Sequence, residues 1–447
     1  MHINLPHEVQ YIINTLEEHG FEAYAVGGCV RDAVLGKEPK DWDICTGALP
    51  GQTAECFGDQ RIFETGLKHG TISLLLGGEI YEITTFRIDG IYKDNRRPES
   101  VQFVSDLHND LARRDFTINA MAYHPAKGII DPFGGIDDIN NQLIRCVGDA
   151  EKRFDEDALR IMRALRFASE LGFAIESHTA EAILGKKNLL HNIASERIRE
   201  ELNRLLIGDN ALNVLTEYVQ IIVTIIPEIS ALIGFEQNNP YHNLDVWGHT
   251  VKSVINAPAD KIIRLTMLLH DIGKPLCYTF ENEKGHFHGH QEVGTEMARK
   301  IMRRLKYDNH TVHAVTTLIT YHDAEIPPRA KTIRRWLNRI GEERLRQLLL
   351  VKRADAYAHS EQFLKPRLDT LDTMTGILDE IIAQNQCFSL KDLAIDGRDL
   401  IAVGIAEGAD IGRVLGVLLD MVIDGKIENE REVLLREAVS AFPLNSD

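Results

Sequence analysis

Two aspartates near the amino end of the chain, Asp41 and Asp43, have the spacing of a metal site. Side chains alternate faces along a strand, so these two carboxylates would point the same way while Trp42 points into the packing behind them. Two carboxylates on one strand edge can hold Mg²⁺ and leave its other positions to water and substrate phosphates. The motif therefore predicts metal-assisted chemistry on a nucleoside triphosphate. A solvated turn is the alternative, because D-x-D alone is a common motif.

The residues just before this motif add a second part of such a site. The segment 21–26, FEAYAV, predicts a short strand, Gly27 and Gly28 interrupt it, and 29–36 predicts a helix that ends at a glycine. A strand, a glycine turn and a helix start place backbone N–H groups where a phosphate can bind. Arg31, in the first helical turn, would add a positive charge for a triphosphate. A tight turn with no ligand is the alternative.

A third group lies in the segment FDEDALRIMRALRF, residues 154–167. In a continuous helix Asp157 and Arg160 lie side by side. The carboxylate would accept a hydrogen bond from an exocyclic amine and the guanidinium would donate one to the neighbouring ring nitrogen, a pattern offered by cytosine and adenine. Guanine and uracil would leave both groups unpaired, at a cost of about 1–3 kcal/mol each. An ordinary surface ion pair is the alternative, whereas Arg163 and Arg166 are expected to reach phosphates rather than act as salt-bridge partners.

The composition describes a soluble globular protein of several domains, with 447 residues, 44% hydrophobic and 26% charged. Six scattered cysteines without a C-x-x-C pair suit a reducing cytoplasm. No signal peptide or membrane span is indicated. The formal net charge of −17 argues against nonspecific coating of nucleic acid, yet it permits a local basic groove.

The order of the expected elements predicts an α+β fold class. Helix and strand patterns alternate at first around one small sheet, and helical patterns follow to the end of the chain. Loop boundaries are expected near 234–240 and near 365–366. The expected domains are a head (1–142), a helical neck with base readout (143–206), a helical body (207–365) and a helical tail (366–447).

Several long motifs follow one another in the first part of the chain: GG-x-VRD-x-x-LG (27–36), DWD (41–43), EITTFR (82–87), DGIYKDNRRPESVQF (89–103), RRDFTINAMA (113–122) and EDALRIMRALRF (156–167). In this order they resemble a known family, the class II bacterial tRNA nucleotidyltransferases, which comprise CCA-adding enzymes and the closely similar poly(A) polymerases. The resemblance implies a polymerase-β-like head domain and a tRNA-binding tail over 396–429.

The resemblance also implies roles for individual residues. Asp41 and Asp43 would hold Mg²⁺, and Glu82 would be either a third acid near the metals or an exposed strand residue. Asp115 and Asn119 would brace the loop that holds them. The implied nucleotide contacts are Gly28, Arg31 and Arg114, with Asp157 and Arg160 on the base and Arg163 and Arg166 completing the pocket.

The implied reaction is attack of the tRNA 3′-hydroxyl on the α-phosphate of CTP or ATP, with release of pyrophosphate. Family members that add only C lack a full version of the segment 87–101, which this chain keeps, so we expect addition of A as well as C. The expected partners are the tRNA 3′ end, CTP and ATP, without DNA or membrane. An A-adding enzyme and a poly(A) polymerase remain alternatives, as does a catalytically silent RNA-binding module.

A second constellation, made of histidines and aspartates between His249 and Asp355, occupies the middle of the chain. Their order resembles that of the HD phosphohydrolase superfamily. Imidazoles and carboxylates drawn from several helices suit a divalent transition metal. Lys274 would contact a phosphate or cap a helix, and terminal or cyclic phosphates of RNA would fit as substrates. An HD hydrolase with a vestigial amino-terminal half is a further alternative, and so is a metal-free scaffold. The candidate ligands are His249, His270, Asp271, His290, His322 and Asp355.

Overall fold

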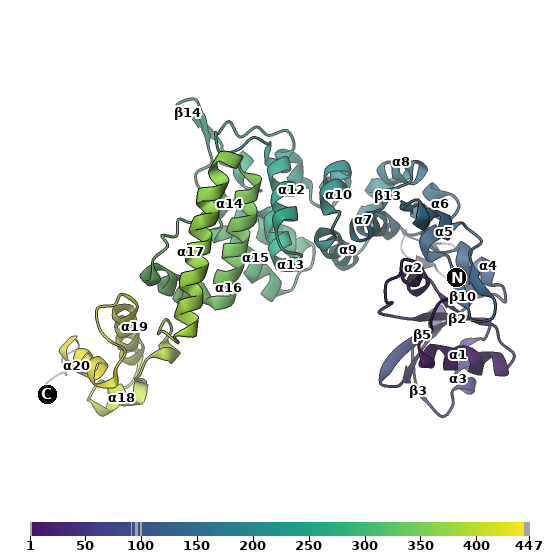
Figure 1. The fold of residues 1–447 in the computed structure, drawn as a ribbon, viewed down its shortest axis with the longest axis horizontal. Coiled ribbons are helices and arrows are strands. Elements are labelled where there is room, and N and C mark those ends of the chain that lie inside the picture. The colour runs from purple at the N-terminus through teal and green to yellow at the C-terminus, as the bar shows by residue number, and fades with distance from the viewer. Residues whose placement is uncertain (1, 91, 94–96, 99–100, 442–447) are drawn as a thin grey trace. The chain divides into compact units, whose positions relative to one another are not determined.

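The computed structural model describes residues 2–90, 92–93, 97–98 and 101–441. The chain divides into two compact units, Met1–Pro227 and Glu228–Asp447. The first unit carries the main sheet and the second is almost entirely helical, which confirms the α+β fold class (Figure 1). The division into head, neck, body and tail domains stays a prediction.

The first unit is built on a seven-stranded sheet with the order β11-β10-β1-β2-β5-β4-β3. Strand β2 pairs antiparallel with β1 and parallel with β5. This central position matters because β2 begins at Asp43. The strands are β1 (Ala23–Val26), β2 (Asp43–Thr46), β3 (Arg61–Gly66), β4 (Thr71–Leu76), β5 (Glu79–Thr85), β10 (Ala122–His124) and β11 (Gly128–Ile130).

Apolar side chains of the sheet pack against the opening helix α1 (His7–Glu18). Ile12, Leu16, Ile44 and Leu74 are fully buried in this core, and Trp42 packs against it. The inward orientation expected for Trp42 is thereby confirmed. The other helices around the sheet are α2 (Gly28–Val34), α3 (Pro50–Cys56), α4 (Leu107–Ala112) and α5 (Gly135–Asn140).

The rest of the first unit is helical, as expected from residue 143 onward. A short parallel pair, β12 (Leu143–Ile144) and β13 (Ala174–Ile175), joins the start of this part to the residues that follow helix α7. Helices α7 and α9 pack closely against each other. The helices are α6 (Ala150–Glu156), α7 (Leu159–Leu171), α8 (Ser177–Lys186), α9 (Ser195–Ile207), α10 (Ala211–Glu217) and α11 (Val219–Ile225).

The second unit is a helical array with one small hairpin, β14 (Thr279–Glu281) and β15 (Lys284–His286). Its longest helix, α16, is interrupted at Gly341, which has a φ of 78°. Its last three helices pack around their own buried cluster, which includes Leu400, Leu418 and Leu434. The helices are α12 (Val246–Asn256), α13 (Lys261–Leu269), α14 (His290–Arg304), α15 (Asn309–Tyr321), α16 (Ala330–Ala358), α17 (Leu364–Ala383), α18 (Gly397–Ala402), α19 (Ala409–Ile423) and α20 (Arg431–Ala441).

One of the two expected loop boundaries is wrong. Residues 234–240 lie outside helices and strands, but Lys365 and Pro366 lie in the first turn of α17. Proline is tolerated there because the N–H groups of the first helical turn have no partner within the helix. None of the described helices is long and apolar enough to cross a membrane.

Candidate active site

The acidic pair lies at the start of strand β2, although only one of its members belongs to the strand. Asp43 is the first residue of β2, whereas Asp41 lies in a bend before it, so the expectation that both stand on one strand is wrong. Both residues are exposed. Glu82 lies directly opposite Asp43 in the parallel pairing of β2 with β5. Asp43 and Glu82 thus share one face of the sheet and Asp41 lies in the bend before it, although the ligand oxygens of the three acids do not all lie within 4.8 Å of one another.

These carboxylates act on one another electrostatically. Partial removal from water raises the pKa of Asp43, and the negative charge of Asp41 raises it further while Arg114 lowers it. Partial removal from water also raises the pKa of Glu82, helped by the charges of Asp43 and Asp41. Groups that repel in this way fit a divalent cation, which would relieve the repulsion. The donor set, all hard oxygen atoms, suits Mg²⁺.

The glycine turn before α2 makes room for an arginine. Gly27 has a φ of +85°, and a Cβ there would lie 2.7 Å from Nη1 of Arg114. Nη2 of Arg114 lies 3.3 Å from Oδ2 of Asp110, a fully buried carboxylate that also pairs with Arg113 at 2.8 Å. Although burial opposes it, these two guanidinium groups lower the pKa of Asp110. Gly27 and Asp110 together fix Arg114 near Asp43.

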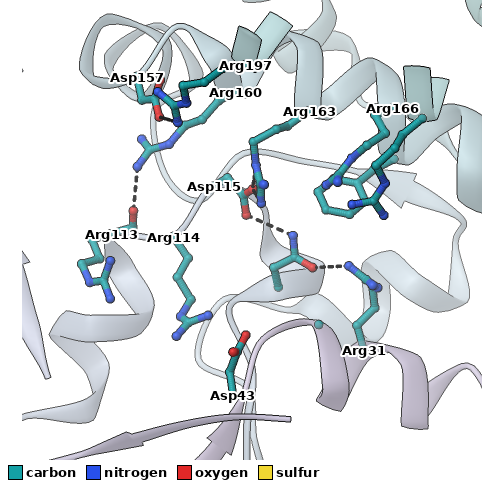
Figure 2. Close-up of a pocket in the computed structure, with 14 residues that line it drawn as sticks. Arg31, Asp43, Arg113, Arg114, Asp115, Asp157, Arg160, Arg163, Arg166 and Arg197 are labelled. Atoms are coloured by element: carbon teal, nitrogen blue, oxygen red, sulfur yellow. Dashed lines mark hydrogen bonds and ion pairs between the residues drawn. The ribbon is translucent and has the colours of Figure 1, made fainter. Parts of the chain in front are cut away.

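A pocket of about 460 Å³ opens between the sheet and the helices α7 and α9, with Asp43 at one end and Asp157 at the other (Figure 2). Its lining contains eight arginines and only three aspartates, although the whole chain has a net charge of −17. This excess of positive charge suits a triphosphate, and it confirms that a local basic groove exists. The lining residues are Gly28, Arg31, Asp43, Arg113, Arg114, Asp115, Asn119, Asp157, Arg160, Arg163, Arg166, Phe167, Arg197 and Arg204.

Asp157 is held at a break between two helices. The expected continuous helix is wrong, because α6 ends at Glu156 and Asp157 has the extended angles φ −135° and ψ 102°. Oδ1 of Asp157 accepts a hydrogen bond from the backbone N–H of Leu159 at 3.1 Å, at the start of α7. Oδ2 accepts one from Nη2 of Arg197, on α9, also at 3.1 Å. The carboxylate of Asp157 therefore lies beside the guanidinium of Arg197 and not, as the sequence had predicted, beside that of Arg160.

Arg160 lines the same pocket with its guanidinium held from three sides. Nη1 donates to Glu156 at 2.8 Å and to the carbonyl oxygen of Arg153 at 3.0 Å. Nη2 donates to the carbonyl oxygen of Arg113 at 2.9 Å. The side chain of Arg160 is 9% exposed. In this arrangement Arg160 ties the helix break to the end of α4.

Arg163 and Arg31 belong to one chain of hydrogen bonds. Nε of Arg163 donates to Asp115 at 2.7 Å, Asn119 donates to Asp115 at 3.0 Å, and Arg31 donates to Asn119 at 2.7 Å (Figure 2). Burial alone would raise the pKa of Asp115, but Arg163 and Asn119 lower it far below its usual range. Asp115 and Asn119 thus hold the two arginines in place, and their expected role in bracing the loop stays a prediction.

Arg166 is also paired. Its Nε lies 3.0 Å from Oε2 of Glu201 and 3.8 Å from Oε2 of Glu170, and burial lowers the pKa of Arg166 to about 10. The guanidinium carbons of Arg31, Arg163 and Arg166 lie 5.1, 5.4 and 4.1 Å from the ring centroid of Phe167. The expectation that Arg163 and Arg166 lack salt-bridge partners is therefore wrong, although both line the pocket.

Sequence reasoning missed the contribution of α9. Arg197, Glu201 and Arg204 are spaced four and three residues apart, so they share one face of that helix. Arg197 and Arg204 line the pocket, and Glu201 pairs with Arg166. The signal was this charged stripe within SERIREELNRLLIG.

The segment 87–101, expected to govern A addition, is described only in part. Residues 91, 94–96, 99 and 100 lie outside the described residues, so the expectation for the segment stays a prediction. Its described parts form two antiparallel pairs, β6 (Arg87–Asp89) with β9 (Val101–Phe103) and β7 (Tyr92–Lys93) with β8 (Arg97–Pro98).

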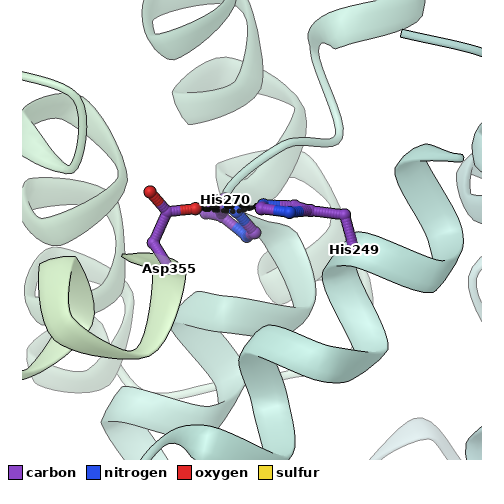
Figure 3. A group of neighbouring side chains, drawn as sticks. All are labelled: His249, His270 and Asp355. Atoms are coloured by element: carbon purple, nitrogen blue, oxygen red, sulfur yellow. Dashed lines mark hydrogen bonds and ion pairs between the residues drawn. The ribbon is translucent and has the colours of Figure 1, made fainter. Parts of the chain in front are cut away.

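In the second unit the six expected HD residues lie together as two groups. In each group the three ligand atoms lie within 4.8 Å of one another, and no other such group of histidine, cysteine or acid side chains occurs among the described residues. Nε2 of His249, on α12, and Nε2 of His270 lie 3.0 and 3.5 Å from Oδ1 of Asp355, on α16 (Figure 3). The groups are His249, His270 and Asp355, and Asp271, His290 and His322.

The imidazole rings are oriented as metal ligands. Nδ1 of His270, His290 and His322 contacts a backbone carbonyl oxygen at 2.7, 2.8 and 2.7 Å. A carbonyl only accepts, so each Nδ1 carries a hydrogen and Nε2 is the nitrogen of the ring that can bind a metal.

The Nε2 atoms lie close together in pairs. Nε2 of His249 lies 3.3 Å from Nε2 of His270, and Nε2 of His290 lies 3.3 Å from Nε2 of His322. Asp271 contacts both groups, with Oδ2 at 3.2 Å from His270 and Oδ1 at 3.5 Å from His290. Imidazole nitrogens gathered beside carboxylates fit divalent cations that accept imidazole nitrogen.

A sheet that presents acids at the edge of an arginine-lined pocket defines a nucleotidyltransferase. Residues 23–145 match the poly A polymerase head domain, 172–232 match the probable RNA and SrmB-binding site of polymerase A, and 289–438 match the putative tRNA nucleotidyltransferase domain 2. These matches agree with the two-unit organisation of sheet and helices.

Curated relatives cover nearly the whole chain. The CCA-adding enzyme of Lactobacillus delbrueckii subsp. bulgaricus is 34% identical over 432 residues, 95% of each protein. That of Geobacillus stearothermophilus is 35% identical over 425 residues, 94% of this chain and 93% of the relative. The chain therefore belongs to the family of CCA-adding enzymes, and membership implies a divalent metal ion in nucleotidyl transfer.

Solved structures agree with this assignment. The crystal structure of the Bacillus stearothermophilus CCA-adding enzyme in complex with CTP has a TM-score of 0.71 and 30% identity, and covers 98% of both chains. The Thermotoga maritima CCA-adding enzyme complexed with tRNA has a TM-score of 0.60 at 22% identity and shows a likeness of fold.

Proposed function

We propose that the protein adds C, C and A to the 3′ end of tRNA from CTP and ATP and releases pyrophosphate. The observation that carries the proposal is the pocket that joins Asp43 at one end to Asp157 and Arg197 at the other. A triphosphate bound along its arginines would have its α-phosphate near the acids and its base near Asp157. An activity on tRNA would place the protein in the cytoplasm, with residues 366–447 as the tRNA-binding tail.

Asp41, Asp43 and Glu82 would hold Mg²⁺. The expected mechanism uses two such ions: when bound, one would lower the pKa of the attacking hydroxyl and the other would stabilise the leaving pyrophosphate. The pocket itself would bind the triphosphate. Arg114, which Gly27 and Asp110 hold in place, would bind it near Asp43. The backbone N–H groups at Gly28 and the positive charge of Arg31 would bind its other phosphates.

Base choice would be made by Asp157 and a guanidinium. Asp157 would accept a hydrogen bond from the exocyclic amine of cytosine or adenine. Arg197 already lies beside Asp157, whereas Arg160 would first have to leave Glu156. Arg163 and Arg166 would form the wall against Phe167 and keep the pocket in shape.

The test is product length on a tRNA that lacks its terminus, with labelled CTP and ATP and Mg²⁺. Three added nucleotides support CCA addition. A single A indicates an A-adding enzyme, and long tails indicate a poly(A) polymerase. No extension at all would refute the assignment of the pocket.

A second candidate function rests on the histidine cluster. We propose that His249, His270 and Asp355 hold one divalent transition metal and that Asp271, His290 and His322 hold another. When bound, such metals supply Lewis acidity toward a phosphate ester. Lys274 would contact the phosphate, since its Nζ lies 2.7 Å from Oδ2 of Asp271. A phosphatase assay with Mn²⁺, Co²⁺ or Ni²⁺ on the wild type and His270→Ala tests this function, and absence of metal-dependent turnover would leave a scaffold.

A further inference from the structure

The cleft over the histidine cluster continues into a second cavity of different chemistry. The cleft has a volume of about 330 Å³ and the second cavity about 430 Å³. His322, Asp323, Asp355 and Arg367 line both. Two of these four are candidate metal ligands, so a molecule held at the cluster can extend into the second cavity.

The cleft carries fixed positive charge beside the cluster. Lys274 is 5% exposed, and its Nζ donates to Gln237 at 2.8 Å and lies 2.7 Å from Asp271. Nη1 of Arg367, on α17, contacts Nδ1 of His359 at 2.5 Å. Both cationic side chains are therefore held in place and line a cleft in which a phosphate would be bound.

Part of the wall of the second cavity is apolar, because Ile326, Leu371 and Met374 line it and are buried. The acids Asp323, Glu325 and Asp355 also line it. Lys352 also lines it, but its Nζ donates hydrogen bonds to the carbonyl oxygens of His322 and Ala324, each at 2.7 Å. These two bonds hold the ammonium group against the backbone. We call this cavity, lined by Ile326, Lys352, Thr370, Leu371 and Met374 among others, the apolar chamber.

We propose that the cluster acts on phosphate esters whose organic group carries a ring, with the phosphate between Lys274 and Arg367 and the ring in the apolar chamber. The inference rests on the proposed metal-dependent hydrolysis and names its substrate class. In the reaction the oxygen of water bonds to phosphorus, the ester P–O bond breaks, and the released alkoxide takes the proton that water loses. A ring of this kind buries apolar surface in the chamber, whereas a methyl ester cannot reach it.

The experiment compares two non-hydrolysable probes, phenylphosphonate and methylphosphonate, on the full chain loaded with Mn²⁺. Isothermal titration calorimetry measures both dissociation constants, and metal analysis of the same samples measures Mn²⁺ content. We expect phenylphosphonate to bind on the order of tenfold more tightly, because its ring is removed from water.

A matched pair of variants on α17 locates the binding of the ring. Thr370 lines the apolar chamber and Thr373 does not, although both are exposed and each hydroxyl donates to the carbonyl oxygen four residues earlier. Thr370→Trp should fill the chamber and abolish the tenfold preference without changing the affinity for methylphosphonate. Thr373→Trp should leave both affinities unchanged.

The outcomes separate the two proposals. A protein that takes up no Mn²⁺ would overturn the metal centre and this inference with it. A protein that takes up Mn²⁺ but binds both probes equally would overturn the substrate class alone. A preference that survives in Thr370→Trp would show that the ring binds elsewhere and would overturn the role of the chamber.

Discussion

Asp43 and Glu82 occupy opposed positions on the parallel strands β2 and β5. Opposed residues of a sheet point to the same face, so the two carboxylates share one exposed edge with the nearby Asp41. Removal from water and the charges of the neighbouring acids raise the pKa of Glu82. The site therefore holds repelling charges that a divalent cation would neutralise.

Replacement of Asp43 by asparagine should reduce nucleotide incorporation by more than about 100-fold, since a metal ligand that contributes several kcal/mol to the transition state is lost. Binding of tRNA should persist because Asp43 contributes to metal binding rather than to RNA contacts. Gel assays of extension and filter binding measure the two effects. Asp59→Asn, an exposed aspartate of the same unit, is the control; equal losses in both variants would contradict the assignment.

The same substitution should raise the melting temperature of the metal-free protein at pH 7. The folded state raises the pKa of Asp43, so it binds that proton more tightly than the unfolded chain does, and stability falls as the pH rises through the interval between the two pKa values. Asparagine does not titrate, so the variant does not lose this stability. The difference in melting temperature between the variant and the wild type should shrink as the pH falls toward the ordinary pKa of an aspartate. Mg²⁺ should stabilise the wild type and have little effect on the variant. Thermal unfolding with and without Mg²⁺ measures both; a less stable metal-free variant at pH 7 would refute the prediction.

Periodicity predicted the elements that position the acids, because strands such as Ala23–Val26 and Asp43–Thr46 carry regular apolar patterns beside a glycine turn. It did not predict the break at Asp157, since no glycine or proline stands between the two helices. The break depends on tertiary contacts: Asp157 accepts hydrogen bonds from the N–H of Leu159 and from Arg197.

Partners distant in the sequence could not be predicted from spacing. Arg163 pairs with Asp115, 48 positions away, and Arg166 pairs with Glu201 on another helix. The histidine cluster was easier to predict from the sequence, because the types of its residues and their order along the chain indicate a metal site. All six expected residues lie together. The apolar chamber beside it was missed because apolar helix positions resemble ordinary core positions.

Base selection should depend on Asp157 and Arg197. Asp157→Ala and Arg197→Met should each lower discrimination against GTP and UTP by about 10- to 100-fold, corresponding to about 1–3 kcal/mol for one unpaired polar group. Single-turnover incorporation of all four nucleotides measures this selectivity. Arg199→Met, on the same helix but outside the pocket lining, is the control. If Arg160→Met relaxes selectivity and Arg197→Met does not, then Arg160 leaves Glu156 and reads the base.

The histidine cluster should bind two metal ions per chain. His249→Ala and His290→Ala should each lose one, because each removes a ligand from a different group. His313→Ala, an exposed histidine of α15, should lose none. Metal analysis after dialysis against Mn²⁺ gives the stoichiometry. Nucleotide incorporation should remain unchanged in all three variants, since every residue that lines the arginine-rich pocket lies in the first unit; loss of both ions in either variant would show one shared centre.

Gly27→Ala should impair nucleotide incorporation through Arg114. The new Cβ would lie 2.7 Å from Nη1 of Arg114, so the guanidinium must move away from its place near Asp43. We expect incorporation to fall at least about tenfold, as when a positioned charge beside a reacting phosphate is displaced. Gly20→Ala is the control for backbone strain, because Gly20 has the same φ of +85° and nothing within 4 Å of its Cβ position.

The pathway of this effect is tested by a double variant. If the methyl group acts by displacing the guanidinium, Gly27→Ala combined with Arg114→Met should be no slower than Arg114→Met alone, because the two changes remove the same interaction. Additive losses would mean that Gly27→Ala disturbs the turn at α2 itself. Comparison of KM and kcat for CTP then distinguishes a phosphate-binding defect from a general loss of folded enzyme, since unfolding lowers kcat without changing KM.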